Sequence, residues 1–125
     1  MKEKLIEMCL LLDVYGKLLT EKQRDLVDFY YNEDLSLGEI AENLGISRQG
    51  VRDGLIHAEE ALRGYEEKLG LMKRMASLRE DADAIKHSAL EVAALNKSNY
   101  FDIRIAERME NIVSHAEAVM SKLEL

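Results

Sequence analysis

Apolar residues recur every three or four positions through the first third of the chain, which is the spacing of one buried helix face. Residues 3–16 form the first such stretch, and we expect an amphipathic helix there that ends near Gly16. Thr20 and Gln23 have the spacing of a capping box, so a second helix is predicted to begin at that point. Its inward-facing residues are expected to be Leu26, Val27, Phe29 and Tyr30.

The stretch LSLGEIAENLGISRQGVRDGL, residues 35–55, has the pattern of a helix-turn-helix. Ser36 is a suitable N-cap for a short helix whose third position is Glu39. Gly45 tolerates the left-handed backbone that ends a helix, and Ser47 is suited to cap the next one. The residues of the short helix that face inward are predicted to be Leu37, Ile40, Ala41 and Leu44.

A longer three-four repeat begins at Val51 and predicts one long helix over residues 47–69. The apolar residues of this repeat are Val51, Leu55, Ala58, Leu62, Tyr65 and Leu69, and Met72 continues it just after the predicted helix. Two further seams follow and predict a helical hairpin. The first is Leu71, Met75, Leu78, Ala82, Ile85, Ala89 and Val92, and the second is Ile105, Met109, Ile112, Ala116, Val119 and Leu123.

These elements place the chain in the all-α class, with a helix-turn-helix domain over residues 1–70 and a C-terminal hairpin over residues 71–125. The chain has no Pro and only 7 Gly, so helix formers fill nearly every stretch. At 125 residues, we expect the two parts to pack as one compact unit. The seams of the hairpin either close the core of a monomer or join two chains, and we prefer a homodimer.

The charge and the cysteine content indicate a cytoplasmic protein. The formal net charge is −7, and the 33% charged and 47% apolar residues are typical of a folded, soluble chain. Cys9 is the only cysteine, so no intramolecular disulfide can form. Glu7 and Asp13 interrupt the apolar stretch near the N-terminus, so we expect no signal peptide, and no run of 18 apolar residues could span a membrane.

The helix-turn-helix suggests how the chain could read DNA. The second helix of such a pair presents its first residues to base edges, while the first helix crosses the phosphate backbone. Arg can form two hydrogen bonds with guanine, Gln can do the same with adenine, and Asp can accept one from cytosine. A capping Ser lies where a phosphate would meet free backbone N–H groups. The candidate DNA-binding residues are Ser36, Ser47, Arg48, Gln49, Arg52 and Asp53.

The charge of this region opposes tight binding to DNA. Residues 36–70 carry four basic and seven acidic side chains, a net charge of −3. Phosphate neutralisation supplies most of the affinity that is independent of sequence, so a dimer or a partner would have to add positive charge. Gly50 and Gly54 lie in the reading helix, where they allow either the close approach of a ligand or the close packing of another helix.

Side chains suited to catalysis or metal binding form no recognisable site. Asp81, Asp83 and His87 lie within two turns of one helix, but Asp81 and Asp83 point in different directions, which indicates a solvated helix face. Cys9 lies among apolar residues and is expected to be a small core residue. We therefore expect no enzyme activity, no metal, no cofactor and no small-molecule substrate.

The stretch LLTEKQRDLVDFYYNEDLSLGEIAENLGISRQGVRDGLIHAEEALRGYE, residues 18–66, resembles region 4 of bacterial sigma factors. With LLLDVYGKLLTEKQ at its start, the stretch over residues 5–72 resembles the YlxM family of small DNA-binding proteins more closely. Gly54 stands where the sigma motif usually has an apolar residue. The sigma resemblance implies base contacts by Arg48, Gln49 and Asp53, and a contact with the DNA backbone by Arg52.

The YlxM resemblance implies an all-helical bacterial protein whose gene commonly accompanies that of the signal recognition particle GTPase. Our first interpretation is a homodimeric helix-turn-helix protein that binds DNA and regulates this secretion pathway. The alternative is an adaptor that keeps the same fold but contacts the protein or RNA component of the signal recognition particle. An acid-rich surface favours such basic partners. Neither interpretation involves a membrane.

Overall fold

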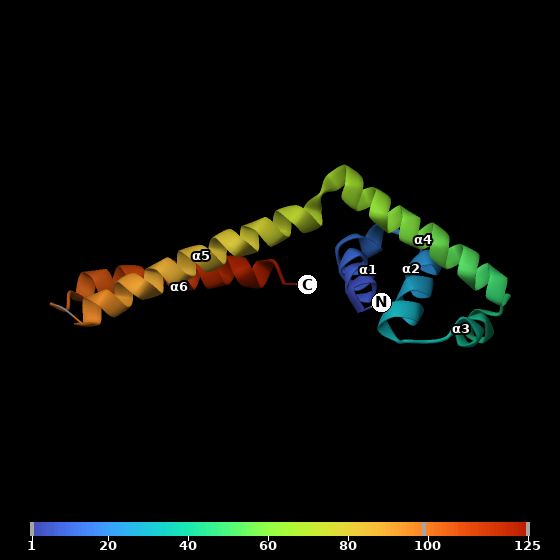
Figure 1. Cartoon of the computed structure of the whole chain (residues 1–125), viewed down its shortest axis with the longest axis horizontal. Coiled ribbons are helices and arrows are strands. Elements are labelled where there is room, and N and C mark those ends of the chain that lie inside the picture. The colour runs from blue at the N-terminus through green and yellow to red at the C-terminus, as the bar shows by residue number, and fades with distance from the viewer. Residues whose placement is uncertain (1, 99, 125) are drawn as a thin grey trace. The chain divides into compact units, whose positions relative to one another are not determined.

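The computed structural model describes residues 2–98 and 100–124, with residues 2–5 described by their backbone alone. The described residues are almost entirely helical and form no strand, which confirms the all-α class. The main helices are α1 Lys2–Tyr15, α2 Glu21–Val27, α3 Leu37–Leu44, α4 Arg48–Leu69, α5 Leu71–Ser98 and α6 Ile103–Lys122 (Figure 1). The fold divides into two compact units, Met1–Met72 and Lys73–Leu125. In the described part of the chain, none of the helices combines the length and the apolar composition that a membrane span requires.

The first unit is built around α4, which contacts α1, α2 and α3 (Figure 1). The predicted inward face of α4 is confirmed over its first four members, which are the buried Val51, Leu55, Ala58 and Leu62. The prediction is wrong at Leu69, which is 46% exposed. The other large, fully buried side chains come from α1, α2 and α3 and are Met8, Leu11, Tyr15, Leu26, Val27 and Ile40.

A π-helical turn, Asp28–Asn32, follows α2 and shifts the buried face by one residue. The Glu33 N–H donates to the Asp28 carbonyl five positions earlier, so the turn holds one residue more than an α-helical turn. Tyr30, predicted to face the core, is 36% exposed, whereas Tyr31 packs against the core instead. Periodicity at 3.6 residues per turn cannot anticipate this extra residue.

Local hydrogen bonds set the start and the end of the short helices. The Thr20 hydroxyl accepts from the Gln23 N–H at 3.2 Å, and the Gln23 side chain accepts from the Thr20 N–H, which confirms the predicted capping box. Ser36 and Glu39 form the same pair at the start of α3. Side chains therefore satisfy backbone donors that a helix start leaves unpaired.

Side chains of the first unit cap the junction between α4 and α5. Gly70 ends α4 in the left-handed conformation, with φ of +62°. The Tyr15 hydroxyl donates to Glu66 Oε1 at 2.5 Å and accepts from the Leu71 N–H at 3.1 Å. Glu66 Oε1 also accepts from the Met72 N–H at 3.0 Å. The backbone at the start of α5 is thus fixed by α1 and α4.

The second unit is the hairpin of α5 and α6. The Asn96 side chain joins the end of α5 to the start of α6, because Nδ2 donates to the Asp102 carbonyl at 3.0 Å and Oδ1 accepts from the Asp102 N–H at 3.1 Å. The predicted seams are only half correct. Ala82, Ala89 and Ala116 are buried between the helices, whereas Leu78, Ile85, Val92, Ile105, Ile112 and Val119 are all exposed.

Candidate nucleic-acid interface

The turn between α3 and α4 has the geometry predicted for a helix-turn-helix. Gly45 adopts φ of +66° and ψ of +34°, and its N–H donates to the Ala41 carbonyl. Ser47 then begins α4, and its hydroxyl accepts from the Gly50 N–H at 3.0 Å. All six predicted DNA-binding residues are exposed: Ser36, Ser47, Arg48, Gln49, Arg52 and Asp53.

The start of α4 differs from the starts of α2 and α3. In those two helices the third residue, Gln23 or Glu39, returns a side chain to the cap. In α4 the third residue is Gly50, and no acidic residue lies in the first turn. The backbone N–H groups and the positive end of the helix dipole are therefore left without a carboxylate of the same turn. A phosphate is a suitable ligand for such a helix start.

Arg48 is exposed, but its guanidinium lies over α3. A Cβ atom placed on Gly38 would come within 2.9 Å of Arg48 Nη2 and 3.1 Å of Nε. Gly38 thus provides the space in which the guanidinium rests. The sequence analysis did not single out Gly38, because the spacing of residues along one helix does not reveal which glycine lies under an arginine of the next.

Gln49 and Asp53, two candidates for base reading, are bonded to each other. Gln49 Nε2 donates to Asp53 Oδ1 at 2.9 Å, one turn apart on the exposed side of α4. Either side chain would have to exchange this bond for one with a base edge. Arg52, one turn after Arg48, is exposed at the same end of the helix.

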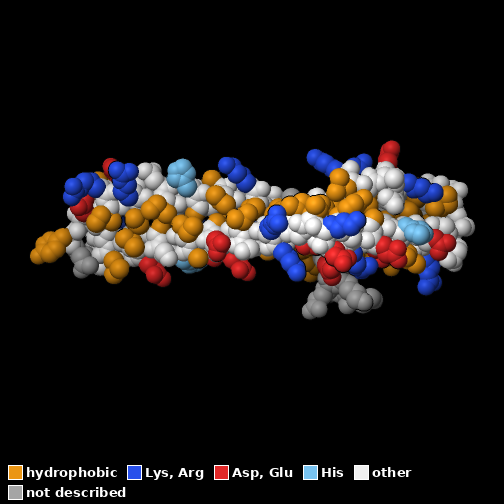
Figure 2. Space-filling view, turned by 90° about the horizontal axis from the view of Figure 1, so that it is seen from above, with side chains coloured by type: hydrophobic (Ala, Val, Ile, Leu, Met, Phe, Trp, Pro, Cys, Tyr) orange, Lys and Arg blue, Asp and Glu red, His pale blue; other side chains and the backbone are white. Residues whose placement is uncertain are grey.

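The surface around the turn carries both signs of charge. A hollow of about 460 Å³ between α3 and α4 is bordered by one cation, Arg48, and by two acidic residues, Glu39 and Glu42. Figure 2 shows basic and acidic side chains interspersed over the face that it presents of the first unit, on the right. The prediction of weak electrostatic attraction to DNA therefore applies to the folded surface as well.

The structure explains the two glycines of the reading helix. A Cβ atom on Gly54 would lie 2.5 Å from Leu26 Cδ1, so Gly54 permits the close packing of α2 on α4. A Cβ atom on Gly50 would meet the Ser47 hydroxyl at 3.2 Å, within the cap itself. Helix packing, rather than the approach of a ligand, thus accounts for Gly54 and for the departure from the sigma pattern at that position.

Other polar clusters have local roles. Among the described residues, no three His, Cys, Asp or Glu side chains are grouped so that they could hold a metal ion. His87 Nδ1 lies 3.5 Å from Asp83 Oδ2 in an exposed pair on α5. Burial raises the pKa of the Cys9 thiol, and the nearby Asp13 and Asp28 raise it further. The thiol is therefore protonated at neutral pH and a weak nucleophile.

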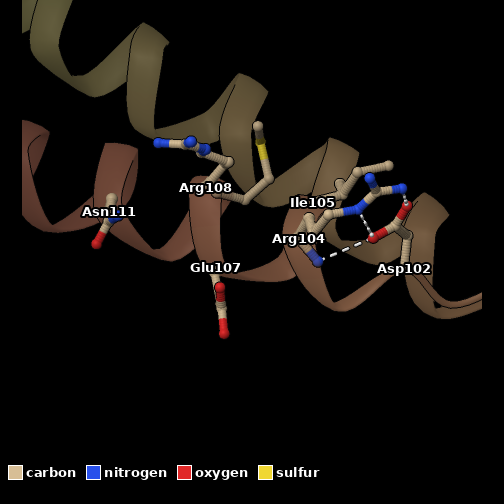
Figure 3. A pocket seen from close by; sticks show the side chains of 7 residues that line it. Asp102, Arg104, Ile105, Glu107, Arg108 and Asn111 are labelled. Carbon is tan, nitrogen blue, oxygen red and sulfur yellow. Dashed lines mark hydrogen bonds and ion pairs between the residues drawn. The ribbon is translucent and has the colours of Figure 1, made fainter.

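The first turns of α6 form a polar cluster that the sequence analysis did not single out (Figure 3). Asp102 caps the helix through the Arg104 N–H, and its carboxylate accepts from the Arg104 guanidinium at 2.9 Å and 3.2 Å. Hydrogen bonds from the side chain and the backbone of Arg104 lower the pKa of Asp102. Arg108 and Asn111 lie on the next turns of the same helix. The cluster is built from one helix, and it fixes the start of α6.

The chain matches the family described as "Putative helix-turn-helix protein, YlxM / p13 like" over residues 2–100. A UPF0122 protein of Caldanaerobacter subterraneus is 51% identical over 86 residues, which are 69% of this chain and 74% of the relative. A UPF0122 protein of Thermoanaerobacter sp. (strain X514) is 43% identical over 124 residues, 99% of this chain and 97% of the relative. One of Listeria innocua is 40% identical over 90% of this chain and 96% of the relative. No solved structure matches the chain significantly.

Proposed function

The chain belongs to the YlxM/p13-like family of helix-turn-helix proteins, and from that premise we propose that it is a regulatory protein that binds DNA. The observation that carries the proposal is the start of α4. There the first turn carries no acidic side chain, which makes the helix terminus a suitable place for a phosphate, and Arg48, Gln49 and Arg52 are exposed on the first two turns.

In the proposed complex the first turn of α4 enters the major groove, and α3 crosses the phosphate backbone near Ser36. Arg48 leaves its place over Gly38 and donates to a guanine. Gln49 and Asp53 exchange their mutual bond for bonds with bases. Arg52 contacts a phosphate and so adds affinity without selecting a sequence.

The mixed charge of the surface limits the affinity of a single copy for DNA. Four basic side chains against seven acidic ones over residues 36–70 supply little attraction to phosphate. We therefore expect weak binding by a single copy, with a shallow dependence on salt concentration. Two copies on one duplex would double the number of phosphate contacts, and their two reading helices would lie about 34 Å apart, one duplex turn.

We expect the sequence preference to depend on Arg48. Fluorescence anisotropy at low salt, over a library of random duplexes, measures the preference of the wild-type chain. Arg48→Ala is expected to cost about 1–3 kcal/mol on the preferred duplex and to relax the choice of base. Arg63→Ala is the matched control, because Arg63 is exposed on the same helix far from the turn. Equal losses in the two variants, or no preferred duplex for the wild type, would refute DNA reading.

An acid-rich surface supports a second proposal, in which the same fold is an adaptor for the signal recognition particle. The net charge of −7 favours a basic protein partner over a nucleic acid. The YlxM resemblance supports this proposal and the proposed regulation of the secretion pathway, and both propose a cytoplasmic chain. Co-sedimentation with the purified protein and RNA components of the particle tests it. Absence of binding to both components at low salt would remove the adaptor.

A further inference from the structure

The hairpin buries a narrow row of side chains, and among the described residues only three alanines and Asn96 of this row are fully buried. Along α5 most of the partly or fully buried positions recur at alternating steps of three and four, and these are Met75, Arg79, Ala82, Lys86, Ala89, Ala93 and Asn96. Met72 and Asp83 are also partly buried but lie outside this series. Along α6 they are Ala106, Met109, Val113, Ala116, Met120 and Leu123. This is the repeat of two antiparallel helices in contact. The fully buried positions of the row are Ala82, Ala89, Ala116 and Asn96.

The larger aliphatic side chains lie in a second row on each helix, next to the buried one. On α5 they are Leu78, Ile85 and Val92, and on α6 Ile105, Ile112 and Val119, each spaced by seven residues. We call these six residues the outer apolar face. All are between 38% and 54% exposed. Two hollows of about 430 Å³ and 340 Å³ lie along the face, and Ile85 and Ile112 border both.

The opposite side of the hairpin is charged. Lys86, at the edge of the buried row, places its Nζ 3.4 Å from Glu117 Oε1 on this side, and the helical spacing places Asp83 and Glu110 there as well. Figure 2 shows hydrophobic side chains running along the hairpin, on the left. Apolar residues on one side and charges on the other are the pattern of helices in a bundle of more than two. Two helices alone cannot cover such a face.

We propose that the outer apolar face docks on the same face of a second copy of the chain and forms a four-helix bundle. The face consists of two rows of equal length and equal spacing, on helices that run in opposite directions. It is therefore complementary to itself under a twofold rotation, as an interface between identical subunits requires. The aliphatic rows of one copy fill the hollows of the other.

The charges that border the face select how the copies pair. The α6 edge carries Arg108, His115 and Lys122, whereas the α5 edge carries Arg74, Asp81 and Ser88, with no net charge. Placing α6 against α6 of the second copy would bring two basic edges together. Placing α5 beside α6 of the second copy avoids this repulsion. The twofold axis then runs along the bundle, and the two copies of residue 73 leave it at the same end.

This arrangement fixes which residues of the two copies are neighbours. Leu78 and Val119 line one hollow, and Ile85 and Ile112 line both, so these pairs lie at matching levels of the hairpin. A twofold axis along the bundle preserves the levels. Asp81 of one copy therefore lies beside His115 of the other. The proposal does not depend on DNA binding, because it uses residues of the hairpin only.

Sedimentation equilibrium of the full chain at micromolar concentration tests the assembly. We expect a dimer for the wild type. Ile85→Glu and Ile112→Glu are expected to raise the dissociation constant on the order of 100-fold or more, because each places two charges in a symmetric apolar interface. Leu90→Glu is the matched control, since Leu90 is 47% exposed on α5 but lies outside the face. A monomeric wild type, or a dimer that Ile85→Glu leaves intact, would overturn the proposal.

Disulfide trapping tests the pairing without disturbing the apolar residues. In a Cys9→Ser background, Asp81→Cys and His115→Cys chains are oxidised separately and as a mixture. A covalent dimer that forms mainly in the mixture is the expected result. A covalent dimer with Asp81→Cys alone would place α5 against α5 and overturn the arrangement, and no covalent dimer in any sample would overturn it as well. This result decides the matter if circular dichroism shows that Ile85→Glu has lost helix.

Discussion

The two units follow the same three-four repeat but bury opposite kinds of side chain. In the first unit the repeat places leucine, isoleucine, methionine and tyrosine inside, and every large side chain that is fully buried in the described part of the chain belongs to this unit. In the hairpin the buried described residues are three alanines and Asn96, while the six aliphatic residues of the outer apolar face remain exposed. The cause is the number of neighbours: α4 contacts three other helices, whereas α5 and α6 form a unit of two.

The difference shows that an apolar repeat identifies the face of a helix that needs to be buried, but it does not identify the element that packs on that face. A helix with partners on several sides buries a wide stripe, and one with a single partner buries only the row that faces it. The first unit therefore has a core of its own. The hairpin gains little from burial until something docks on its outer apolar face.

Truncation of one aliphatic residue in each unit should give the largest loss of stability in the first unit and a much smaller loss in the hairpin. Leu62→Ala is expected to lower the free energy of unfolding by about 2–5 kcal/mol, because Leu62 is 0% exposed and a cavity replaces its side chain. Ile85→Ala, at a position 54% exposed, should cost less than about 1 kcal/mol in the monomeric chain. Urea unfolding followed by circular dichroism measures both changes.

Hydrogen exchange resolved along the chain provides the control for this pair. Leu62→Ala should increase exchange in α1 to α4, and Ile85→Ala only in α5 and α6. A cost above about 2 kcal/mol for Ile85→Ala in a monomer would show that its side chain is covered within the same chain.

The elements that the sequence predicts well are those fixed by neighbouring residues. Thr20 with Gln23, Ser36 with Glu39, and Gly45 all act within one helical turn, and the structure confirms each. The exchange of Tyr30 for Tyr31 was not predictable from periodicity, because it arises from one extra residue in a π-helical turn. The division of the hairpin seams was not predictable either, since inner and outer rows have the same seven-residue spacing.

The candidate site shows the same limit. The exposure of Arg48 and Gln49 follows from their place after the Ser47 cap, and the sequence is sufficient to predict it. The resting place of Arg48 over Gly38 depends on how α3 crosses α4. The contact that Gly54 allows with Leu26 depends on how α2 crosses α4. The angles at which these helices cross cannot be predicted from a single sequence.

Close helix contact in the first unit should depend on one glycine, and its replacement gives the next largest effect. Gly54→Ala inserts a methyl group 2.5 Å from Leu26 Cδ1, and overpacking of about 1–3 kcal/mol should exceed the gain of about 1 kcal/mol in helix propensity. Gly64→Ala is the matched control on the same helix, because no atom lies within 4 Å of the new Cβ. It should stabilise the chain by about 1 kcal/mol. Thermal unfolding of both variants tests this, and a stabilising Gly54→Ala would contradict the close contact.

The smallest expected effect is a loss of stability at alkaline pH that belongs to the first unit. Burial and then the hydrogen bond to Glu59 raise the pKa of Tyr31, and burial and Glu66 raise that of Tyr15. An unfolded tyrosine ionises near pH 10, so the stabilisation is complete below that pH and is lost as the pH rises above it. Tyr31→Phe should remove about 1 kcal/mol at pH 7 and flatten the decline between pH 9 and 11. Tyr100→Phe, at a hairpin residue 96% exposed, should leave the decline unchanged in urea unfolding, because its surroundings hardly alter on unfolding. A decline of equal slope in wild type and Tyr31→Phe would show that folding does not raise the pKa of Tyr31.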